Sequence, residues 1–291
     1  ENSSNSITPF CYALTTIEIE IERYPNPIIT TPNGVTTICV DFTSGLVVRP
    51  LTLDSNIPNP ADYTFEWYED TVLIPGATGP TYTVDTASAT GATRNYTVRV
   101  ISNSPLLCET TSAGFDVIQS GQASIPTGTI GYTVTNAFTN SQIITVTVEG
   151  WGTYEYSLDD GPRQTSNVFE GVPLGNHVIH VWDTEGGLAF SCEELVINDV
   201  QVIDYPHYFT PNGDGFHDTW NVVGLFNYAD QTKIYIFDRY GKFIKQISPM
   251  GVGWDGTFNG EALPSTDYWF TVEYEENGES KIFKAHFSLK R

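Results

Sequence analysis

The chain has 291 residues, of which 35 are acidic and 13 are basic, so its formal net charge at pH 7 is -22. An acidic protein of this kind repels nucleic acid and anionic lipid, and we expect neither class of partner. No run of apolar residues approaches the roughly 18 that a membrane-spanning helix needs. The acidity itself suits the solubility of a surface protein.

The charge is unevenly distributed. Residues 1–204 contain 24 acidic residues, five arginines and no lysine, whereas residues 205–291 contain eight basic residues, including every lysine of the chain. Solubility of a surface protein is the simpler interpretation of the acidity, and the alternative is that the last part of the chain meets a different partner from the rest.

Short runs rich in Val, Ile, Thr and Tyr, separated by 25 glycines and 17 prolines, predict an all-β chain of three tandem β-sandwich domains. Residues 1–24 read as the closing strand of a preceding repeat and a linker, so we expect this chain to be the end of a longer protein. The predicted domains then cover residues 25–120, 121–204 and 205–291. In chain order, the predicted strands are 17–21, 38–42, 46–53, 63–68, 82–84, 96–101, 115–118, 129–134, 143–148, 154–158, 177–182, 195–197, 220–223, 233–237, 243–247, 268–274 and 281–289.

Three further local predictions follow from residue type. Trp67 lies in a predicted strand and is expected in the core. Asp159-Asp160-Gly161 is a hairpin signal in which the glycine takes a positive φ, and Gly241 is expected to close a second hairpin in the same way.

The four cysteines have no CxxC spacing, which argues against a zinc site. Cys11, Cys108 and Cys192 each precede the last strand of a predicted module, and Cys39 does not. The natural disulfide within residues 25–120 is therefore Cys39–Cys108, with Cys11 and Cys192 left without partners in this chain. Against that pairing, Cys39 alternates with larger apolar side chains, which would direct it away from the core.

The sequence contains no GxSxG, HExxH, phosphate-loop or dinucleotide motif, so we predict a non-enzymatic protein with no catalytic residues. His177 and His180 have the spacing of a metal pair, but on a strand an odd separation sends them to opposite faces.

A glycine-rich loop is the one candidate metal site. Asn212, Asp214 and Asp218 surround Gly213 and Gly215, and calcium prefers oxygen ligands in such a loop. The bidentate acid of an EF-hand is missing further along. The alternative is a tight turn in which these side chains bond their own backbone, and no other cofactor is predicted.

Four motifs in the last domain occur in a recognisable order. They are Tyr208–Asp218, Phe237–Lys242, Trp254–Thr257 and Leu289–Arg291. They resemble the type B sorting domain of type IX secretion in Bacteroidetes, the gliding motility-associated C-terminal domain. The resemblance implies export across the outer membrane to the cell surface or beyond, with docking to a partner protein of the SprF/PorP kind and to the translocon. The residues that it implies for recognition are Phe209, Thr210, Pro211, Asn212, Gly213, Asp214, Gly215, Asp218, Asp238, Arg239, Gly241, Trp254, Asp255, Gly256, Lys290 and Arg291. From the residues alone, Asp238 and Arg239 could pair in the hairpin turn or present a docking contact, and turn chemistry is the default. Trp254–Gly256 likewise is typical of a turn above a packed Trp254.

The upstream modules carry resemblances of their own. The stretch from Cys39 through Phe65–Tyr68 to Cys108 is similar to bacterial immunoglobulin-like repeats, and Tyr154–Gly161 is similar to repeats of SprB-like gliding adhesins. These resemblances imply that the chain is the C-terminal fragment of a cell-surface adhesin involved in gliding motility. The repeats of such an adhesin meet an external surface or polysaccharide.

The alternative function belongs to another class. Secreted polysaccharide-degrading enzymes can carry the same sorting domain behind accessory carbohydrate-binding modules. Tyr154, Tyr156 and Trp182 would then form the sugar platform, although alternation places the two tyrosines on one face, where core packing is the simpler use.

Overall fold

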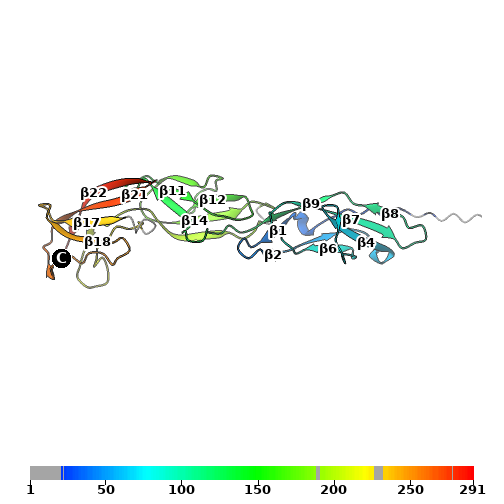
Figure 1. The fold of residues 1–291 in the computed structure, drawn as a ribbon, viewed down its shortest axis with the longest axis horizontal. Helices are drawn as coiled ribbons and strands as arrows, with labels where there is room; N and C mark the ends of the chain where they lie inside the picture. Colours follow the sequence, from blue (N-terminus) through cyan, green and yellow to red (C-terminus); the bar gives the residue numbers. More distant parts are fainter. Residues whose placement is uncertain (1–20, 22, 188–190, 226–231, 277) are drawn as a thin grey trace, which may run out of the picture. The chain divides into compact units, whose positions relative to one another are not determined.

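The computed structural model describes residues 21, 23–187, 191–225, 232–276 and 278–291, and its strands confirm the prediction of an all-β chain (Figure 1). Within those residues the only helical elements are two short 3-10 turns, η1 (Pro32–Gly34) and η2 (Pro60–Asp62). The strands are β1 (Thr37–Val40), β2 (Val47–Arg49), β3 (Leu51–Asp54), β4 (Tyr63–Glu69), β5 (Val72–Leu73), β6 (Thr81–Val84), β7 (Arg94–Ser102), β8 (Glu109–Thr111), β9 (Phe115–Ser120), β10 (Tyr132–Thr135), β11 (Gln142–Val146), β12 (Tyr154–Leu158), β13 (Val168–Val172), β14 (Asn176–Asp183), β15 (Leu195–Gln201), β16 (Tyr208–Phe209), β17 (Lys233–Phe237), β18 (Phe243–Ile247), β19 (Thr257–Phe258), β20 (Glu261–Ala262), β21 (Asp267–Glu276) and β22 (Glu279–Leu289). No helix in the described part of the chain is long and apolar enough to cross a membrane.

The chain folds as two compact units. The first contains residues Glu1–Gly34, Thr52–Thr83 and Arg94–Asp116, and the second contains Val35–Leu51, Val84–Thr93 and Val117–Arg291. The predicted boundaries at residues 24, 120 and 204 stay predictions. The strand predicted at residues 17–21 lies, except for Ile21, outside the described residues.

In the first unit, β4 pairs antiparallel with β5 and with β7. Trp67 of β4 and Tyr96 of β7 are fully buried, and the Trp67 indole N–H donates to the Gly79 carbonyl oxygen at 3.0 Å. The predicted core role of Trp67 is therefore confirmed. Period-two alternation along β7, where every second residue from Arg94 to Ser102 is buried, explains why its prediction succeeded.

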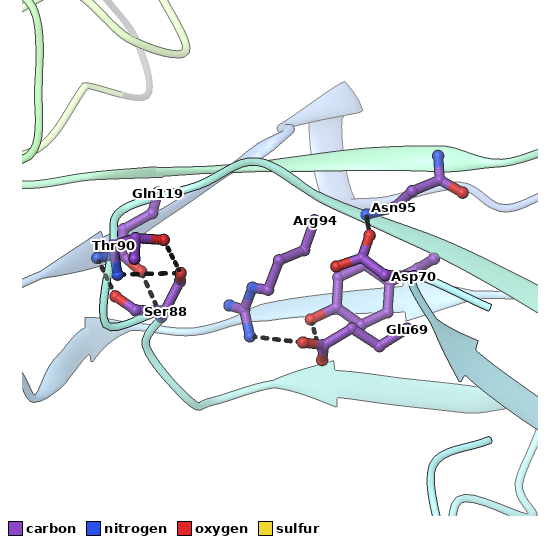
Figure 2. A network of polar contacts seen from close by, with 8 residues as sticks. Glu69, Asp70, Ser88, Thr90, Arg94, Asn95 and Gln119 are labelled. Carbon is purple, nitrogen blue, oxygen red and sulfur yellow. Dashed lines mark hydrogen bonds and ion pairs between the residues drawn. The ribbon is translucent and has the colours of Figure 1, made fainter. Parts of the chain in front are cut away.

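A polar network holds the β4 and β7 ends together in this unit (Figure 2). The Arg94 guanidinium lies 3.5 Å from the Glu69 carboxylate, which also accepts the Tyr96 hydroxyl at 2.8 Å. Asp70 accepts the Asn95 backbone N–H at 2.9 Å. Burial, and then the hydrogen bond to Glu69, raise the pKa of Tyr96, so its hydroxyl stays a donor at any physiological pH.

In the second unit, β1 pairs antiparallel with β2 and parallel with β9. The disulfide there joins Cys39 to Cys192, with their Cα atoms 5.7 Å apart. The predicted Cys39–Cys108 bridge is therefore wrong, as is the expectation that Cys192 has no partner. Cys108 is outside the bridge, and Cys11 lies outside the described residues.

Alternation along β1 explains this pairing. All four residues of β1 are buried, so both faces of the strand are covered. Cys39 points away from Ile38 and Val40, toward the segment before β15 that carries Cys192. That segment is fixed by buried Asp183, whose carboxylate accepts the Cys192 backbone N–H at 2.8 Å. The predicted bridge joined two cysteines of residues 25–120, whereas the observed one joins Cys39 to a cysteine of residues 121–204.

Two three-stranded antiparallel sheets follow, with the orders β10-β11-β13 and β12-β14-β15. The turn predicted at Asp159-Asp160-Gly161 follows β12. It is present, because the Gly161 N–H donates to the Leu158 carbonyl oxygen at 3.0 Å. The positive φ is taken by Asp159, at 51°, and not by Gly161, so the predicted role of the glycine is wrong. Asp159 holds that conformation because its carboxylate accepts the Val178 N–H at 2.9 Å and contacts the His177 ring.

The last part of the chain forms a five-stranded sheet with the order β16-β22-β21-β17-β18, and a separate pair β19-β20. The long hairpin β21–β22 stays in register from Asp267 opposite Ser288 to Glu276 opposite Glu279. β17 and β18 have the predicted bounds.

The strand predicted at residues 220–223 is wrong. The segment has only single bridges, from Trp220 to Trp254 and from Val223 to Asp204. Side-chain bonds take the place of a ladder, because the Trp220 indole donates to the Pro206 carbonyl at 2.7 Å and the Asn221 amide donates to carbonyls of residues 248–251. The strand predicted over 46–53 is two strands, β2 and β3.

Candidate recognition surface

The loop that follows β16 is organised around the carboxylate of Asp218. One oxygen accepts the backbone N–H groups of Asn212 and Gly213 at 2.9 and 2.6 Å, and the other accepts that of Gly215 at 2.8 Å. The bonds from Gly213 and Gly215, with a smaller one from Asn212, hold the pKa of Asp218 below its ordinary value. Asp218 is therefore the anion that closes the loop.

Asn212 and Asp214 bond the loop's own backbone. The Asn212 side-chain oxygen accepts the Asp214 N–H at 3.0 Å, and Asp214 accepts the Phe216 N–H at 2.8 Å. This is the turn chemistry that the sequence offered as the alternative to calcium. In the described residues no three acidic, histidine or cysteine side chains gather as a metal site.

Trp254 packs beneath a turn, as predicted. It is fully buried, and its ring centroid lies 5.5 Å from that of Phe209 and 4.9 Å from that of Tyr268. Its indole N–H donates to the Thr257 carbonyl at 2.8 Å, while Asp255 accepts the Thr257 N–H at 3.1 Å. The turn is thus bonded from both sides.

Gly256 is the point at which three of the motifs meet. Its φ is 76°, and a Cβ atom there would lie 2.7 Å from Leu289, 3.1 Å from Arg291 and 3.3 Å from the Phe209 ring. The positive φ and the close approach of the buried Leu289 side chain both favour glycine at this position. Strand β16, the Trp254–Thr257 turn and the end of β22, which are far apart in the sequence, therefore all meet at Gly256.

Lys290 and Arg291 contact the residues around Gly256 and β16. The Lys290 N–H donates to the Phe209 carbonyl at 3.0 Å, and its ammonium lies 4.3 Å from the Tyr208 ring centroid. The Arg291 guanidinium donates to the carbonyl oxygens of Leu263 and, at 3.2 Å, Gly256. Both side chains stay exposed, so their charge remains available.

The hairpin turn after β17 carries the remaining motif. Gly241 has a φ of 82°, as predicted, and its N–H donates to the Asp238 carbonyl at 3.0 Å. The Asp238 carboxylate accepts the N–H groups of Tyr240 and Lys242, each at 2.9 Å. Turn chemistry is thus confirmed for Asp238. Among the ion pairs of the described residues, none joins Arg239 to Asp238, and the Arg239 guanidinium reaches the Thr266 hydroxyl instead.

Between this turn and the segment 263–266 lies a pocket of about 380 Å³. Tyr268 forms part of its wall and donates its hydroxyl to the Pro264 carbonyl at 3.0 Å. Burial raises the pKa of Tyr268, which keeps this hydroxyl protonated. The pocket was not predicted, because the residues from 261 to 266 match no motif and acquire their role only by proximity.

Thr210 and Pro211 belong to the loop after β16, and the two histidines considered as a metal pair belong to β14. Thr210 donates its N–H to the His217 carbonyl at 2.7 Å, and Pro211 follows it in the loop. His177 is buried and His180 is not, in agreement with opposite faces on β14.

The aromatic residues considered as a sugar platform are engaged within the protein. Tyr154 and Tyr156 pack against the hydrophobic core of the second unit, and the Tyr154 hydroxyl donates to the Gly121 carbonyl at 3.1 Å. The Arg163 guanidinium lies 3.8 Å from the ring centroid of Trp182. Core packing of the two tyrosines is confirmed, and one face of the tryptophan is covered.

Comparison with known families identifies the last domain. Residues 203–289 match the family model described as the CHU_C Type IX secretion signal domain. Such a domain implies export to the cell surface or the extracellular space. No curated protein matches the chain.

Among solved structures, the chain is similar to arrays of small β domains. The three N-terminal domains of the outer capsid protein Hoc of bacteriophage RB49 are 12% identical, with 92% of this chain and 98% of that one covered and a TM-score of 0.32. Sidekick-1 immunoglobulin domains 1–4 are 8% identical, with 91% and 74% covered and a TM-score of 0.30. Fibronectin(III)-like modules of Clostridium thermocellum CbhA are 16% identical, with 58% and 91% covered and a TM-score of 0.29. Such TM-scores assign neither a function nor an arrangement of domains.

Proposed function

We propose that residues 205–291 act as a folded export signal that the type IX secretion apparatus recognises by docking, with no covalent bond made or broken. The observation that carries the proposal is the meeting of three separate motifs at Gly256, where an added Cβ would lie 2.7 Å from Leu289 and 3.3 Å from the Phe209 ring. Because these motifs adjoin only after folding, the signal is a property of the folded domain and not of a linear peptide.

Charge supports the same proposal. Every lysine of the chain lies in this domain, and the exposed side chains of Lys290 and Arg291 sit beside the motif loops. In an otherwise acidic protein, such cations suit an acidic receptor surface, since complementary charge raises both the encounter rate and the specificity of docking. A partner of the SprF/PorP kind together with the translocon is the proposed receptor.

The rest of the chain is proposed to be the end of an SprB-like gliding adhesin, displayed on the surface of a bacterium of the Bacteroidetes. Support comes from the β modules that precede the signal and from the adhesin-like repeat at Tyr154–Gly161. In this proposal the modules space and display a binding region, and they meet an external surface or polysaccharide.

The test removes residues 205–291 from an epitope-tagged chain in a bacterium with an active type IX system. We expect the full chain on the cell surface and the truncated chain in the periplasm, both quantified by immunoblotting of cell fractions. The periplasmic level of the truncated chain serves as the control for degradation. Surface amounts that equal those of the full chain would refute the proposal.

A further inference from the structure

The pocket beside the Asp238–Lys242 turn is suited to a side chain from another molecule. Its volume of about 380 Å³ falls in the range of sites that hold small ligands or single large side chains. Ile244, Phe258, Leu263 and Tyr268 make part of its wall apolar, and polar side chains, those of Asp238, Ser265 and Thr266 among them, line the rest. A surface pocket of this size with an apolar part to its wall suits an aromatic or leucine side chain as the occupant.

Two cations border the pocket. Arg239 and Lys242 are both exposed, and none of the ion pairs formed by the described residues involves either of them. The nearest carboxylate in the turn, that of Asp238, accepts two backbone N–H groups. Lys242 lies 4.8 Å from the Phe258 ring centroid, which holds its ammonium at the pocket rim.

Some other cations of the described residues are neutralised in ion pairs instead. Lys281 is paired with buried Glu276, and Arg99 is paired with Glu66 and Glu109. In a protein with 35 acidic and 13 basic residues, two exposed cations beside this pocket, outside the ion pairs of the described residues, are complementary in charge to external carboxylates. Exposed Tyr240, 87% accessible, extends the apolar surface next to them.

We infer that this pocket binds an acidic peptide segment of a partner protein, with one large apolar side chain in the pocket and flanking carboxylates on Arg239 and Lys242. The inference rests on the proposed function insofar as the partner belongs to the export apparatus. The peptide binding itself is measured without that apparatus.

The binding experiment uses the full chain and fluorescein-labelled, capped peptides of the form Asp-Glu-X-Glu-Asp, with X as Phe, Tyr, Trp, Leu or Ser. We expect saturable binding by fluorescence anisotropy for at least one of the four apolar peptides, weakening with salt, and none for the Ser peptide. The variant Arg239→Gln/Lys242→Gln should bind at least about fivefold more weakly. The matched variant Lys233→Gln/Lys284→Gln removes two exposed lysines elsewhere and should bind as the wild type does.

Three outcomes overturn the inference. They are no binding by any apolar peptide up to about 1 mM, equal loss in both double variants, and a concentration-dependent dimer that Arg239→Gln/Lys242→Gln dissolves, which would make a second copy of this chain the occupant. Equal melting temperatures of the two double variants exclude misfolding as the cause of any difference.

Export of the same variants separates this inference from the proposed function. If truncation after residue 204 blocks export while Arg239→Gln/Lys242→Gln neither binds peptide differently nor affects export, the export signal stands and the pocket has no part in it. If truncation leaves export intact, the proposed function fails whatever the peptides do.

Discussion

Phe138 and Phe283 are stacked face to face, with ring centroids 4.1 Å apart and planes within 4° of each other. Phe138 belongs to the loop after β10, and Phe283 to the last strand, β22. Beside them, buried Glu276 accepts the Ala137 N–H at 3.1 Å. The core of the second unit runs without interruption from residues of β10 to those of β22. The matched export domain is therefore packed against the sheets that precede it in the second unit and is not a loosely tethered label.

Replacing Phe138 by alanine should lower the free energy of unfolding of the second unit by about 2 kcal/mol, because the half-buried ring loses three aromatic contacts. The backbone of Phe138 has a φ of 62°, so alanine keeps the strain and loses the packing that offsets it. Urea unfolding followed by intrinsic fluorescence measures the change. Phe216→Ala, which removes a ring that is 73% exposed, is the control and should change stability by less than about 0.5 kcal/mol. Equal effects of the two substitutions would contradict the stacking.

Replacing Gly256 by alanine should destabilise the export domain by at least about 2 kcal/mol. The added methyl group meets both an unfavourable φ and the side chain of Leu289. Gly260→Ala is the matched control, since Gly260 has a φ of 83° but no atom within 4 Å of the place that the methyl group would occupy, and it should cost only about 1 kcal/mol. Thermal melting of both variants gives the comparison, and equal shifts would show that the close approach at Gly256 contributes nothing.

The loop around Asp218 should depend on pH in one direction. Its pKa is lowered in the folded state by the N–H groups of Gly213 and Gly215, so its contribution is fully present above the unfolded value, about 3.9. That contribution is lost as the pH falls through the lower, folded pKa. Amide hydrogen exchange at Gly213 and Gly215 should therefore accelerate, after correction for the intrinsic rate, below about pH 4. Asp218→Asn should show weak protection at every pH, and protection equal to that of the wild type would contradict the assignment.

Calcium should leave the melting temperature unchanged at millimolar concentration. The oxygens of Asn212, Asp214 and Asp218 already accept backbone N–H groups, which leaves the loop short of the six to eight ligands that calcium takes. The control is the Asp218→Asn variant, whose melting temperature should likewise be unchanged by calcium. A rise in melting temperature that this variant abolishes would restore the calcium interpretation.

Replacing Cys39 and Cys192 together by serine should destabilise the second unit by about 2–4 kcal/mol, because the bridge closes a long loop with a sequence separation of 153. Peptide mapping without reduction should recover the Cys39–Cys192 pair. Cys108→Ser is the control and should leave that mapped pair intact. Recovery of a Cys39–Cys108 peptide instead would overturn the assignment.

The strands were the most predictable part of the fold. Alternating burial along β7 and β14 leaves a period-two pattern in the sequence, and β12, β17 and β18 have the predicted bounds. The disulfide could not be predicted, because the choice between Cys108 and Cys192 depends on which segment covers the outer face of β1. That is a tertiary fact, although the alternation of Cys39 already indicated an outward direction.

The sequence predicted which motifs belong to the candidate site, but not which of their residues lie next to each other in the fold. Glycine at residue 241 signals its own turn, whereas the requirement for glycine at residue 256 comes from Leu289 and Phe209, which approach it only in the fold. The prediction of Trp220 as a strand residue was wrong. Its indole N–H donates to the Pro206 carbonyl, and an alternating pattern of apolar residues gives no sign of such a side-chain bond. The cations at residues 239 and 242 are apparent in the sequence, but the pocket between their turn and the segment 263–266 is not.

The most direct test of the central claim compares surface exposure of the full chain in a type IX-competent strain and in an otherwise identical strain without the translocon. Protease added to intact cells should digest the tagged chain in the first strain and leave it protected in the second. Digestion to the same extent in both strains would contradict the assignment of residues 205–291 as a type IX export signal.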